Sequence, residues 1–219
     1  MSDIKKELKY SIGNDEINVW LTSVYPIANI DTNNYELINY VLEDINKNYL
    51  TINGALFNVK KDSEQLRDVM ERNNYKLMNR NYKIKNKKYN IDKNKYRCST
   101  IIADREKEYY AKHLNDLENV NTGLEIINLI LEKGNEKVYA FYREEELIGI
   151  MAINDEVPIY SLYADNKDIM VYMIQYIVNE YKKDIFITVG STHTILIDAL
   201  DKIGAEIEWN IYRGESQLN

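Results

Sequence analysis

Few side chains in this sequence combine acid–base chemistry with a position at the end of a strand. His193 follows the strand-like run 185–190 and stands between Thr192 and Thr194. An imidazole titrates near neutral pH, so His193 could pass a proton to or from a reacting group. The alternative is that His193 is an ordinary exposed residue at the start of the helix that follows.

Two tyrosines and two acidic residues are the other candidates for proton transfer. Tyr160 and Tyr163 lie on the strand-like run 159–164, where a phenol could supply a proton, although tyrosines on strands more often pack in a core. Asp155 and Glu156 precede that run, and either carboxylate could accept a proton from an amine. Turns, however, are where such acidic residues most often occur.

Patterns for several other kinds of site are lacking. No spacing of His, Cys, Asp and Glu is typical of a metal site, and neither a P-loop nor a nucleophile elbow occurs. His113, beside leucines on a helical stretch, is interpreted as structural. The single cysteine, Cys98, allows no internal disulfide, which fits a reducing cytoplasm, and we expect it to be an inert, packed thiol.

Composition and charge indicate an ordinary soluble globular protein of one large or two small domains. Hydrophobic residues make up 45% and charged residues 29% of the 219 positions, enough for a sizeable core. The net charge of −7 argues against a protein that coats nucleic acid. Neither a signal-peptide core nor a membrane-spanning run occurs, so we expect a cytoplasmic protein without membrane contact.

A basic segment from Lys76 to Arg97 interrupts this acidic background, with Tyr82, Tyr89 and Tyr96 interspersed. Its cations and rings could hold single-stranded nucleic acid. The favoured alternative is a solvated linker between two domains, because no second basic cluster supports nucleic-acid binding.

An internal repeat sets the expected domain organisation. A shift of 130 positions pairs Val59 with Val189 without a gap. The further matched pairs are Leu66 with Leu196, Asp68 with Asp198, Met70 with Leu200, Leu77 with Ile207 and Tyr82 with Tyr212. Two copies point to two similar modules rather than a solenoid, and we predict modules over residues 1–90 and 91–219.

Hydrophobic periodicity predicts the elements of both modules. The first should hold a hairpin (6–12 and 17–23), a polar loop after Pro26, and then helix, strand, helix, strand at 35–45, 55–59, 63–72 and 75–84. The second should have the order β-α-α-β-β-β-α-β-α-β. Its elements are a strand at 99–103, helices from 106 and 122, strands at 138–143, 147–153 and 159–164, a helix capped by Asp168, and a final strand, helix and strand over 185–213.

This order, with the hairpin from Val138 to Ile153, resembles the GCN5-related N-acetyltransferase (GNAT) superfamily over about residues 97–214. The first module resembles the latter half of the same fold. The resemblance implies an α/β (α+β layered) protein with a mixed, mostly antiparallel sheet flanked by helices, in two tandem modules. In that superfamily the fourth strand and the helix after it splay from the fifth strand. Acyl-coenzyme A lies in the cleft, with its pyrophosphate on backbone amides.

The resemblance places this cofactor, acetyl-CoA, on residues 162–170. The residues implied to contact it are Leu162, Tyr163, Ala164, Lys167, Asp168, Ile169 and Met170. The segment lacks the glycines of the family's phosphate loop, and the carboxylates of Asp165 and Asp168 would repel pyrophosphate. Lys167 would offset part of that repulsion.

The implied function is transfer of an acyl group from acyl-CoA to an amine of a small molecule or peptide by direct attack, without a metal. Candidate catalytic residues are His193, Tyr163 and Glu156. Where the family commonly has Asn and Tyr, this chain has His193 and Leu200, and leucine cannot act as a general acid. The alternative function is a catalytically inactive acetyltransferase-like binding or scaffold protein. The acceptor and the oligomeric state stay open.

Overall fold

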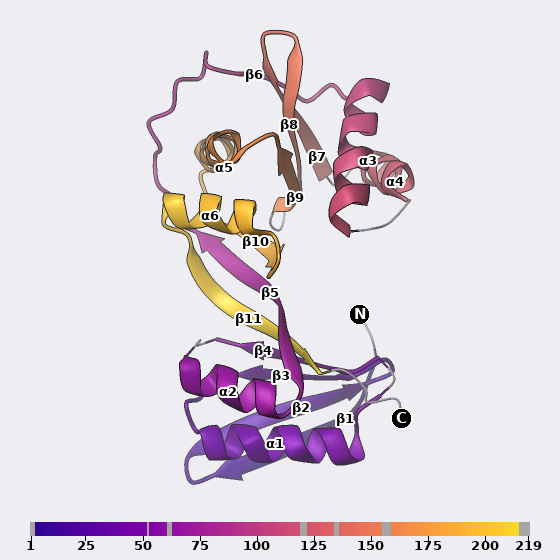
Figure 1. The fold of residues 1–219 in the computed structure, drawn as a ribbon, viewed down its shortest axis with the longest axis vertical. Helices are drawn as coiled ribbons and strands as arrows, with labels where there is room; N and C mark the ends of the chain where they lie inside the picture. Colours follow the sequence, from indigo (N-terminus) through magenta and orange to yellow (C-terminus); the bar gives the residue numbers. More distant parts are fainter. Residues whose placement is uncertain are drawn as a thin grey trace. The chain divides into compact units, whose positions relative to one another are not determined.

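The computed structural model describes residues 3–51, 53–60, 63–118, 122–133, 136–154 and 159–214. The chain divides into two units, drawn together in Figure 1. Unit 1 consists of Met1–Asn81, Gly190–Thr192 and Ile207–Asn219, and unit 2 of Tyr82–Val189 and His193–Glu206. Each unit therefore combines segments that are far apart in the sequence.

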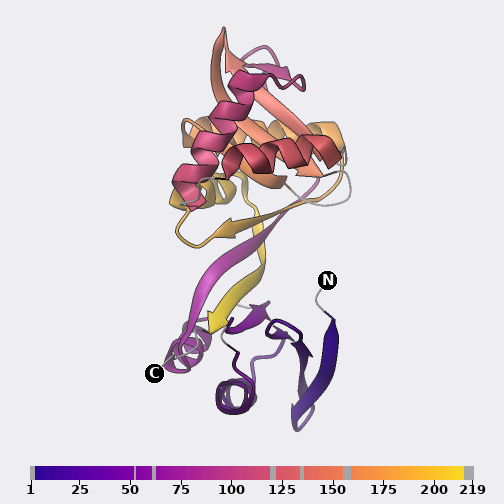
Figure 2. The ribbon, with the colours of Figure 1, turned by 90° about the vertical axis from the view of Figure 1, so that its right-hand side faces the viewer.

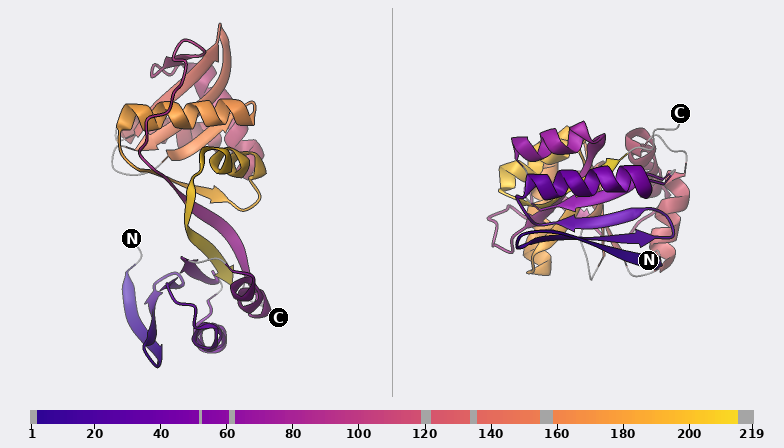
Figure 3. Two further views of the ribbon diagram at one scale, coloured as in Figure 1. Left: turned by 90° about the vertical axis from the view of Figure 1, so that its left-hand side faces the viewer. Right: turned by 90° about the horizontal axis from the view of Figure 1, so that it is seen from below.

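Unit 1 is a sheet with helices on one face (Figure 3). Its strands lie in the order β1-β2-β3-β4-β11-β5. Asn34 and Ser63 cap the two helices by accepting hydrogen bonds from the amides of Leu37 and Leu66. The elements are β1 (Ile4–Ile12), β2 (Asp15–Thr22), β3 (Pro26–Ile30), α1 (Tyr35–Asn48), β4 (Ala55–Val59), α2 (Glu64–Arg72), β5 (Tyr75–Ile84) and β11 (Glu206–Gly214).

A polar loop was expected after Pro26, but residues Pro26–Ile30 form the strand β3. It runs parallel to β4, with Ile27 opposite Leu56, and it buries Ala28 and Ile30. Proline is tolerated there because it is the first residue of the strand, where a missing ladder hydrogen bond matters least.

Unit 2 has helices on both faces of its sheet. Helices α3 and α4 cover one face in Figure 2, and α5 and α6 cover the opposite face in Figure 3. The strand order is β10-β9-β8-β7-β6, and all pairs except β9–β10 are antiparallel. The elements are β6 (Arg97–Ser99), α3 (Asp104–Glu118), α4 (Gly123–Lys133), β7 (Glu136–Arg143), β8 (Glu146–Asn154), β9 (Ile159–Ala164), α5 (Lys167–Tyr181), β10 (Ile185–Gly190) and α6 (Thr194–Ile203).

The predicted element order of the second half and the fold class are confirmed. Two details were wrong. The strand expected at 99–103 is the shorter β6, and α5 is capped by Asn166 instead of Asp168, because the Asn166 side chain accepts from the first-turn amides.

The element bounds follow the 130-position repeat. Ala55 begins β4 and Ile185 begins β10, while Glu64 and Thr194 begin the helices that follow. The spatial units divide the chain differently from the predicted modules 1–90 and 91–219, since β11 belongs to unit 1 except for Glu206. That residues 1–90 and 91–219 are two related modules stays a prediction.

Residues 85–96, which we call the strap, are bonded to α5 and do not form a free linker. The amide of Asn86 donates to Asp184 Oδ1 at 2.8 Å. Tyr89 and Asn179 exchange two hydrogen bonds, from Tyr89 N to Asn179 Oδ1 at 2.9 Å and from Asn179 Nδ2 to Tyr89 O at 3.0 Å. Further along, Lys93 pairs with Glu180 at 2.7 Å.

None of the helices in the described ranges is long and apolar enough to cross a membrane.

Candidate functional site

Strand β9 is interrupted by a bulge. Its register with β8 passes from Ala152 opposite Ser161 to Ile153 opposite Ile159, so Tyr160 is an extra residue on β9. Strand β10 runs parallel to β9 and pairs at Ile187 opposite Ile159, with no further register pair among the described residues. The carboxyl halves of β9 and β10 therefore separate beyond the bulge, and bulges of this kind commonly re-aim backbone at a site.

Tyr163 faces helix α3 in an aromatic cluster. Its ring is perpendicular to Tyr110, with centroids 5.4 Å apart, and nearly parallel to His113 at 6.0 Å. Tyr109 stacks at a tilt on His113 at 4.4 Å and donates its hydroxyl to Asp165 Oδ1 at 2.9 Å. Burial raises the pKa of Tyr109, and the hydrogen bond to Asp165 raises it further.

His113, for which a structural role was predicted, has its ring nearly parallel to that of Tyr163. The spacing of Tyr109 and His113, four residues apart on one helix, was the signal that could have found this cluster. Together with Asp165, the four rings of this cluster form the polar side of the candidate site.

The start of α5 is closed by its own cap. Asn166 Oδ1 accepts from the amides of Asp168 and Ile169, both at 3.1 Å. The amide of Met170 donates to the Asn166 carbonyl at 3.1 Å, as the first helical bond. The amide of Asp165 donates to the Ile148 carbonyl at 3.1 Å. Three amides of the expected phosphate cradle, those of Asp168, Ile169 and Met170, are thus already bonded.

Two ion pairs cross from the start of α5 to α6. Lys202 Nζ lies 2.8 Å from Asp168 Oδ1, and Lys167 Nζ lies 3.8 Å from Asp198 Oδ2. The hydrogen bond and charge of Lys202 lower the pKa of Asp168. Lys167, which was expected to offset the repulsion of a phosphate, is instead paired with a carboxylate of the same protein.

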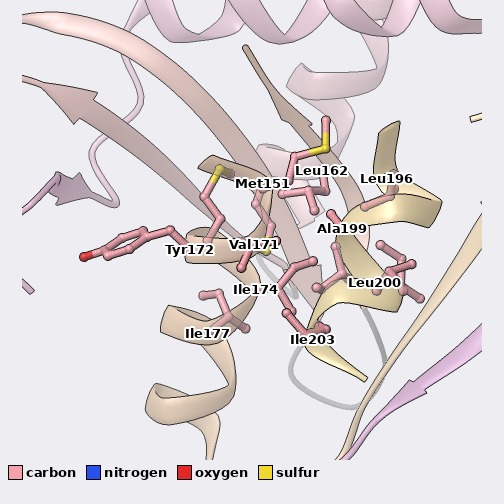
Figure 4. Close-up of a cluster of buried hydrophobic side chains, with 14 of the residues drawn as sticks. Met151, Leu162, Val171, Tyr172, Ile174, Ile177, Leu196, Ala199, Leu200 and Ile203 are labelled. Carbon is pink, nitrogen blue, oxygen red and sulfur yellow. The ribbon is translucent and has the colours of Figure 1, made fainter. Parts of the chain in front are cut away.

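Behind these pairs, α5 and α6 pack through an apolar layer (Figure 4). Leu162 of β9 and Ile174 of α5 point towards Leu196 and Leu200 of α6. Leu200 is completely buried. The position where the family commonly has a tyrosine is therefore filled by a core leucine, which has no proton to donate.

The other predicted site residues are distributed around this layer. His193 is the partly exposed N-cap residue of α6, and its side chain makes no capping hydrogen bond. Ala164 pairs with Gly149 at the end of β9, and Ile169 and Met170 are buried against the core. Glu156 lies outside the described residues. Within those residues, no group of His, Cys, Asp and Glu side chains could hold a metal.

Solved structures share this fold. An acetyltransferase of the GNAT family from Colwellia psychrerythraea matches with a TM-score of 0.59 at 9% identity, covering 97% of this chain and 85% of its own. A GCN5-related N-acetyltransferase from Sphaerobacter thermophilus matches with a TM-score of 0.51 at 10% identity, covering 91% and 76%. A functionally unknown conserved protein from Staphylococcus epidermidis matches with a TM-score of 0.50 at 10% identity, covering 97% and 92%.

No protein-family model matches the sequence, and a search of curated proteins finds no match. The structural likeness shows that the chain has a GNAT-like fold, as the sequence resemblance implied. At about 10% identity, likeness of this kind carries no activity with it.

The residues at the start of α5 do not fit the pyrophosphate of acyl-CoA. A phosphate bound to a helix start needs amides that are free to donate. Here the side chain of Asn166 takes two of them, and Asp165 and Asp168 place carboxylates beside the same turn. The geometry of β9 resembles an acyl site, whereas the phosphate cradle is closed.

Proposed function

We propose that this protein uses the GNAT-like fold for binding, as a non-catalytic ligand- or partner-binding protein, and does not transfer acyl groups from acyl-CoA. The observation that carries the proposal is the Asn166 cap, which occupies the amides on which the cofactor's pyrophosphate would rest. The buried Leu200, in place of a proton donor, points the same way.

The energies involved are large enough to matter for binding. Replacing an asparagine cap costs about 0.5–2 kcal/mol. A phosphate would have to displace the cap, which lowers affinity roughly 2-fold to 30-fold. Repulsion by the carboxylates of Asp165 and Asp168 adds to this penalty.

Thermal unfolding with acetyl-CoA tests the proposal. A ligand at one hundred times its Kd stabilises a protein by about 2.7 kcal/mol, so a functional acyl-CoA site would raise Tm clearly at millimolar ligand. We expect no change for the wild-type chain.

The Asn166→Gly variant frees the two amides, and it should gain stabilisation by acetyl-CoA or inorganic pyrophosphate. Asn34→Gly is the matched control, because Asn34 caps α1 in the same way in unit 1. Stabilisation of the wild type to the same degree as Asn166→Gly would show that the cap does not close the site, and would sink the proposal.

N-acyl transfer is the second candidate, and the bulge at Tyr160 with the divergence of β9 and β10 favours it. In that function the cosubstrate is acetyl-CoA and the acceptor is a small-molecule or peptide amine. Tyr163, backed by His113, is the candidate proton donor on the α3 face, with His193 and Glu156 as further candidates. The Leu162–Met170 segment would line the acyl-CoA site.

Release of free thiol from acetyl-CoA in the presence of a panel of amines and lysine peptides tests this second candidate. Turnover that falls at least about tenfold in Tyr163→Phe would support it, since a positioned proton donor contributes about 10²–10⁴. Absence of turnover across the panel would eliminate it.

A further inference from the structure

A cavity of about 690 Å³ lies in unit 2, between the strap and the carboxyl-terminal half of α5. The strap side contributes Lys87, Lys88, Tyr89 and Ile91, and α5 with its C-cap contributes Val178 and Lys182. Its volume is in the range that small-molecule sites commonly have. This strap pocket is separate from the start of α5, since its α5 residues come from the opposite end of that helix.

The walls of the strap pocket are fixed by hydrogen bonds. Asn86 Nδ2 donates to the Lys182 carbonyl at 2.8 Å, and the paired hydrogen bonds of Tyr89 and Asn179 hold the middle of the strap. Tyr172 donates its hydroxyl to the Asp92 carbonyl at 3.1 Å. A ligand would therefore enter a preformed site without first ordering the loop, which lowers the entropic cost of binding.

The charge of the pocket is strongly positive. Its lining includes four lysines and no acidic residue. Lys93 is neutralised by Glu180, whereas Lys87 donates to a neutral acceptor, the Ile203 carbonyl, at 3.0 Å. No ion pair involves Lys88 or Lys182 among the residues that the structure describes.

The carboxylate of Asp184, two residues after Lys182, already has two partners. Asp184 accepts from the Asn86 amide at 2.8 Å and pairs with Lys83 at 2.9 Å. These two interactions lower the pKa of Asp184, the Asn86 hydrogen bond most. Among the described residues, the ammonium groups of Lys87, Lys88 and Lys182 thus have no carboxylate in an ion pair, which leaves the pocket positively charged.

Apolar surface forms the inner part of the same pocket. Val178 is fully buried in the core, and Tyr89 and Ile91 pack against that core from the strap. Lys87 Nζ lies over the Tyr89 ring at 4.9 Å from its centroid, so the ring already attracts a cation on that side. A ligand that matches the pocket has both an apolar body and an anionic head.

Single-stranded nucleic acid fits the basic segment less well. Bases would need a series of exposed rings on which to stack. Tyr82 and Tyr96 are buried, at 1% and 6% exposure, so only Tyr89 of the three tyrosines is accessible to a base. The chemistry favours one small molecule over a polymer.

We propose that the strap pocket binds a small organic anion, whose aromatic or aliphatic body contacts Tyr89 and Ile91 and whose phosphate or carboxylate lies between Lys88 and Lys182. The proposal does not depend on whether the start of α5 binds acyl-CoA. It assigns a second site, at the other end of the helix, to a different part of the molecule.

Titration of the intact protein with 8-anilinonaphthalene-1-sulfonate, an aromatic sulfonate whose fluorescence rises in apolar surroundings, tests the site. We expect saturable binding at one site. The double variant Lys88→Gln/Lys182→Gln should weaken it roughly threefold to tenfold, since each exposed charge pair contributes modestly. The control Lys5→Gln/Lys6→Gln removes the same charge from exposed positions of β1 in unit 1 and should leave the affinity unchanged.

A second variant reports on the place of binding. Asn90 lines the pocket and is exposed, so Asn90→Trp puts a fluorophore at its rim. Its emission should change on titration with the ligand class itself. Adenosine monophosphate is the phosphate member of that class and octanoate the carboxylate member. Inorganic phosphate tests the head group alone, and its titration should not reach saturation up to about 10 mM.

Equal affinity in both double variants, together with an unresponsive Asn90→Trp, would overturn the proposal. Failure of this proposal can also be told apart from failure of the proposed function by repeating the acetyl-CoA test on the double variant. Stabilisation by acetyl-CoA that Lys88→Gln/Lys182→Gln abolishes belongs to the strap pocket and supports the proposal made here. Stabilisation that survives in that variant belongs to the start of α5 and contradicts the proposed function instead.

Discussion

Lys202 Nζ donates a hydrogen bond to Asp168 Oδ1 at 2.8 Å, so the last turn of α6 is joined to the first turn of α5. Both charges also suit their helix ends, because a helix favours an anion near its amino terminus and a cation near its carboxyl terminus. The carboxylate of Asp168 therefore already supplies the negative charge that the amino terminus of α5 favours, and no external anion is required.

Replacing Lys202 by Met should raise the pKa of Asp168 towards the ordinary value of 3.8 for an aspartate. A carboxyl whose pKa is lowered by folding stabilises the protein above its unfolded pKa, and that contribution is lost as pH falls through the lowered folded value. The stability difference between wild type and Lys202→Met should thus shrink below about pH 4. Carboxyl chemical shifts followed by NMR measure the pKa. Lys5→Met, on β1, is the control and should leave the Asp168 titration unchanged.

Replacing Leu200 by Ala should lower the free energy of unfolding by about 2–5 kcal/mol, because the side chain is fully buried between α5 and α6. Ile195→Ala on the same helix, where half of the side chain is exposed, should change it by less than about 0.5 kcal/mol. Urea unfolding gives both values. Leu200→Tyr, which restores the family's residue, should also destabilise, by about 1–3 kcal/mol, through overpacking. A stable, active Leu200→Tyr would contradict the view that this layer is core.

Gly54 and Gly13 offer a matched pair, since both have positive φ, at 78° and 62°. In Gly13→Ala the added methyl meets open space, so the free energy of unfolding should fall by about 1–2 kcal/mol, the penalty for an alanine in the left-handed conformation. In Gly54→Ala the added methyl would also collide with the Gly214 carbonyl oxygen at the end of β11, so the loss should be larger by about 1–3 kcal/mol. Chemical denaturation of the two variants measures the difference. Equal losses would mean that β11 does not lie against this turn.

Cys98 should react slowly with thiol reagents. Burial raises the pKa of its thiol from 9.0 to about 11, so at pH 8 the thiolate fraction is about a hundredfold below that of a free cysteine. The rate of iodoacetamide alkylation, followed by mass spectrometry, should rise about tenfold per pH unit above pH 8 and level off only near pH 11. Denatured protein is the control, and alkylation of native protein at the denatured rate near pH 8 would contradict a shielded thiol.

Local sequence patterns predicted most of the helices and strands, because each of these elements is determined by residues that are close together in the sequence. The run Ala55–Val59 predicted the bounds of β4, and the apolar spacing within 63–72 predicted α2. Strand β3 was missed because its five residues begin with a proline and are ordered by pairing with β2 and β4, which no local pattern reveals. Tertiary pairing overrides local propensity in short strands of this kind.

The candidate site was predictable only in part. The absence of glycines in the 164–170 loop was visible in the sequence, but the two ion pairs from α6 depend on how α5 and α6 pack, which local sequence does not reveal. The strap shows the same limit. Its lysines and tyrosines suggested a linker, whereas the hydrogen bonds of Asn179, some ninety positions later, make it one wall of a cavity.

The pairing of β4 with β11 has a consequence for biosynthesis. Asn210 to Gly214 lie opposite Val59 to Ala55, so the partner of β4 is translated about 150 residues after it (210 − 59 = 151). At a translation rate of about 5–20 residues per second, the edge of β4 stays unpaired for on the order of ten seconds or more after it emerges from the ribosome. An unpaired edge is a template for association with other chains. Premature termination anywhere before β11 should therefore yield aggregating products instead of a soluble amino-terminal half.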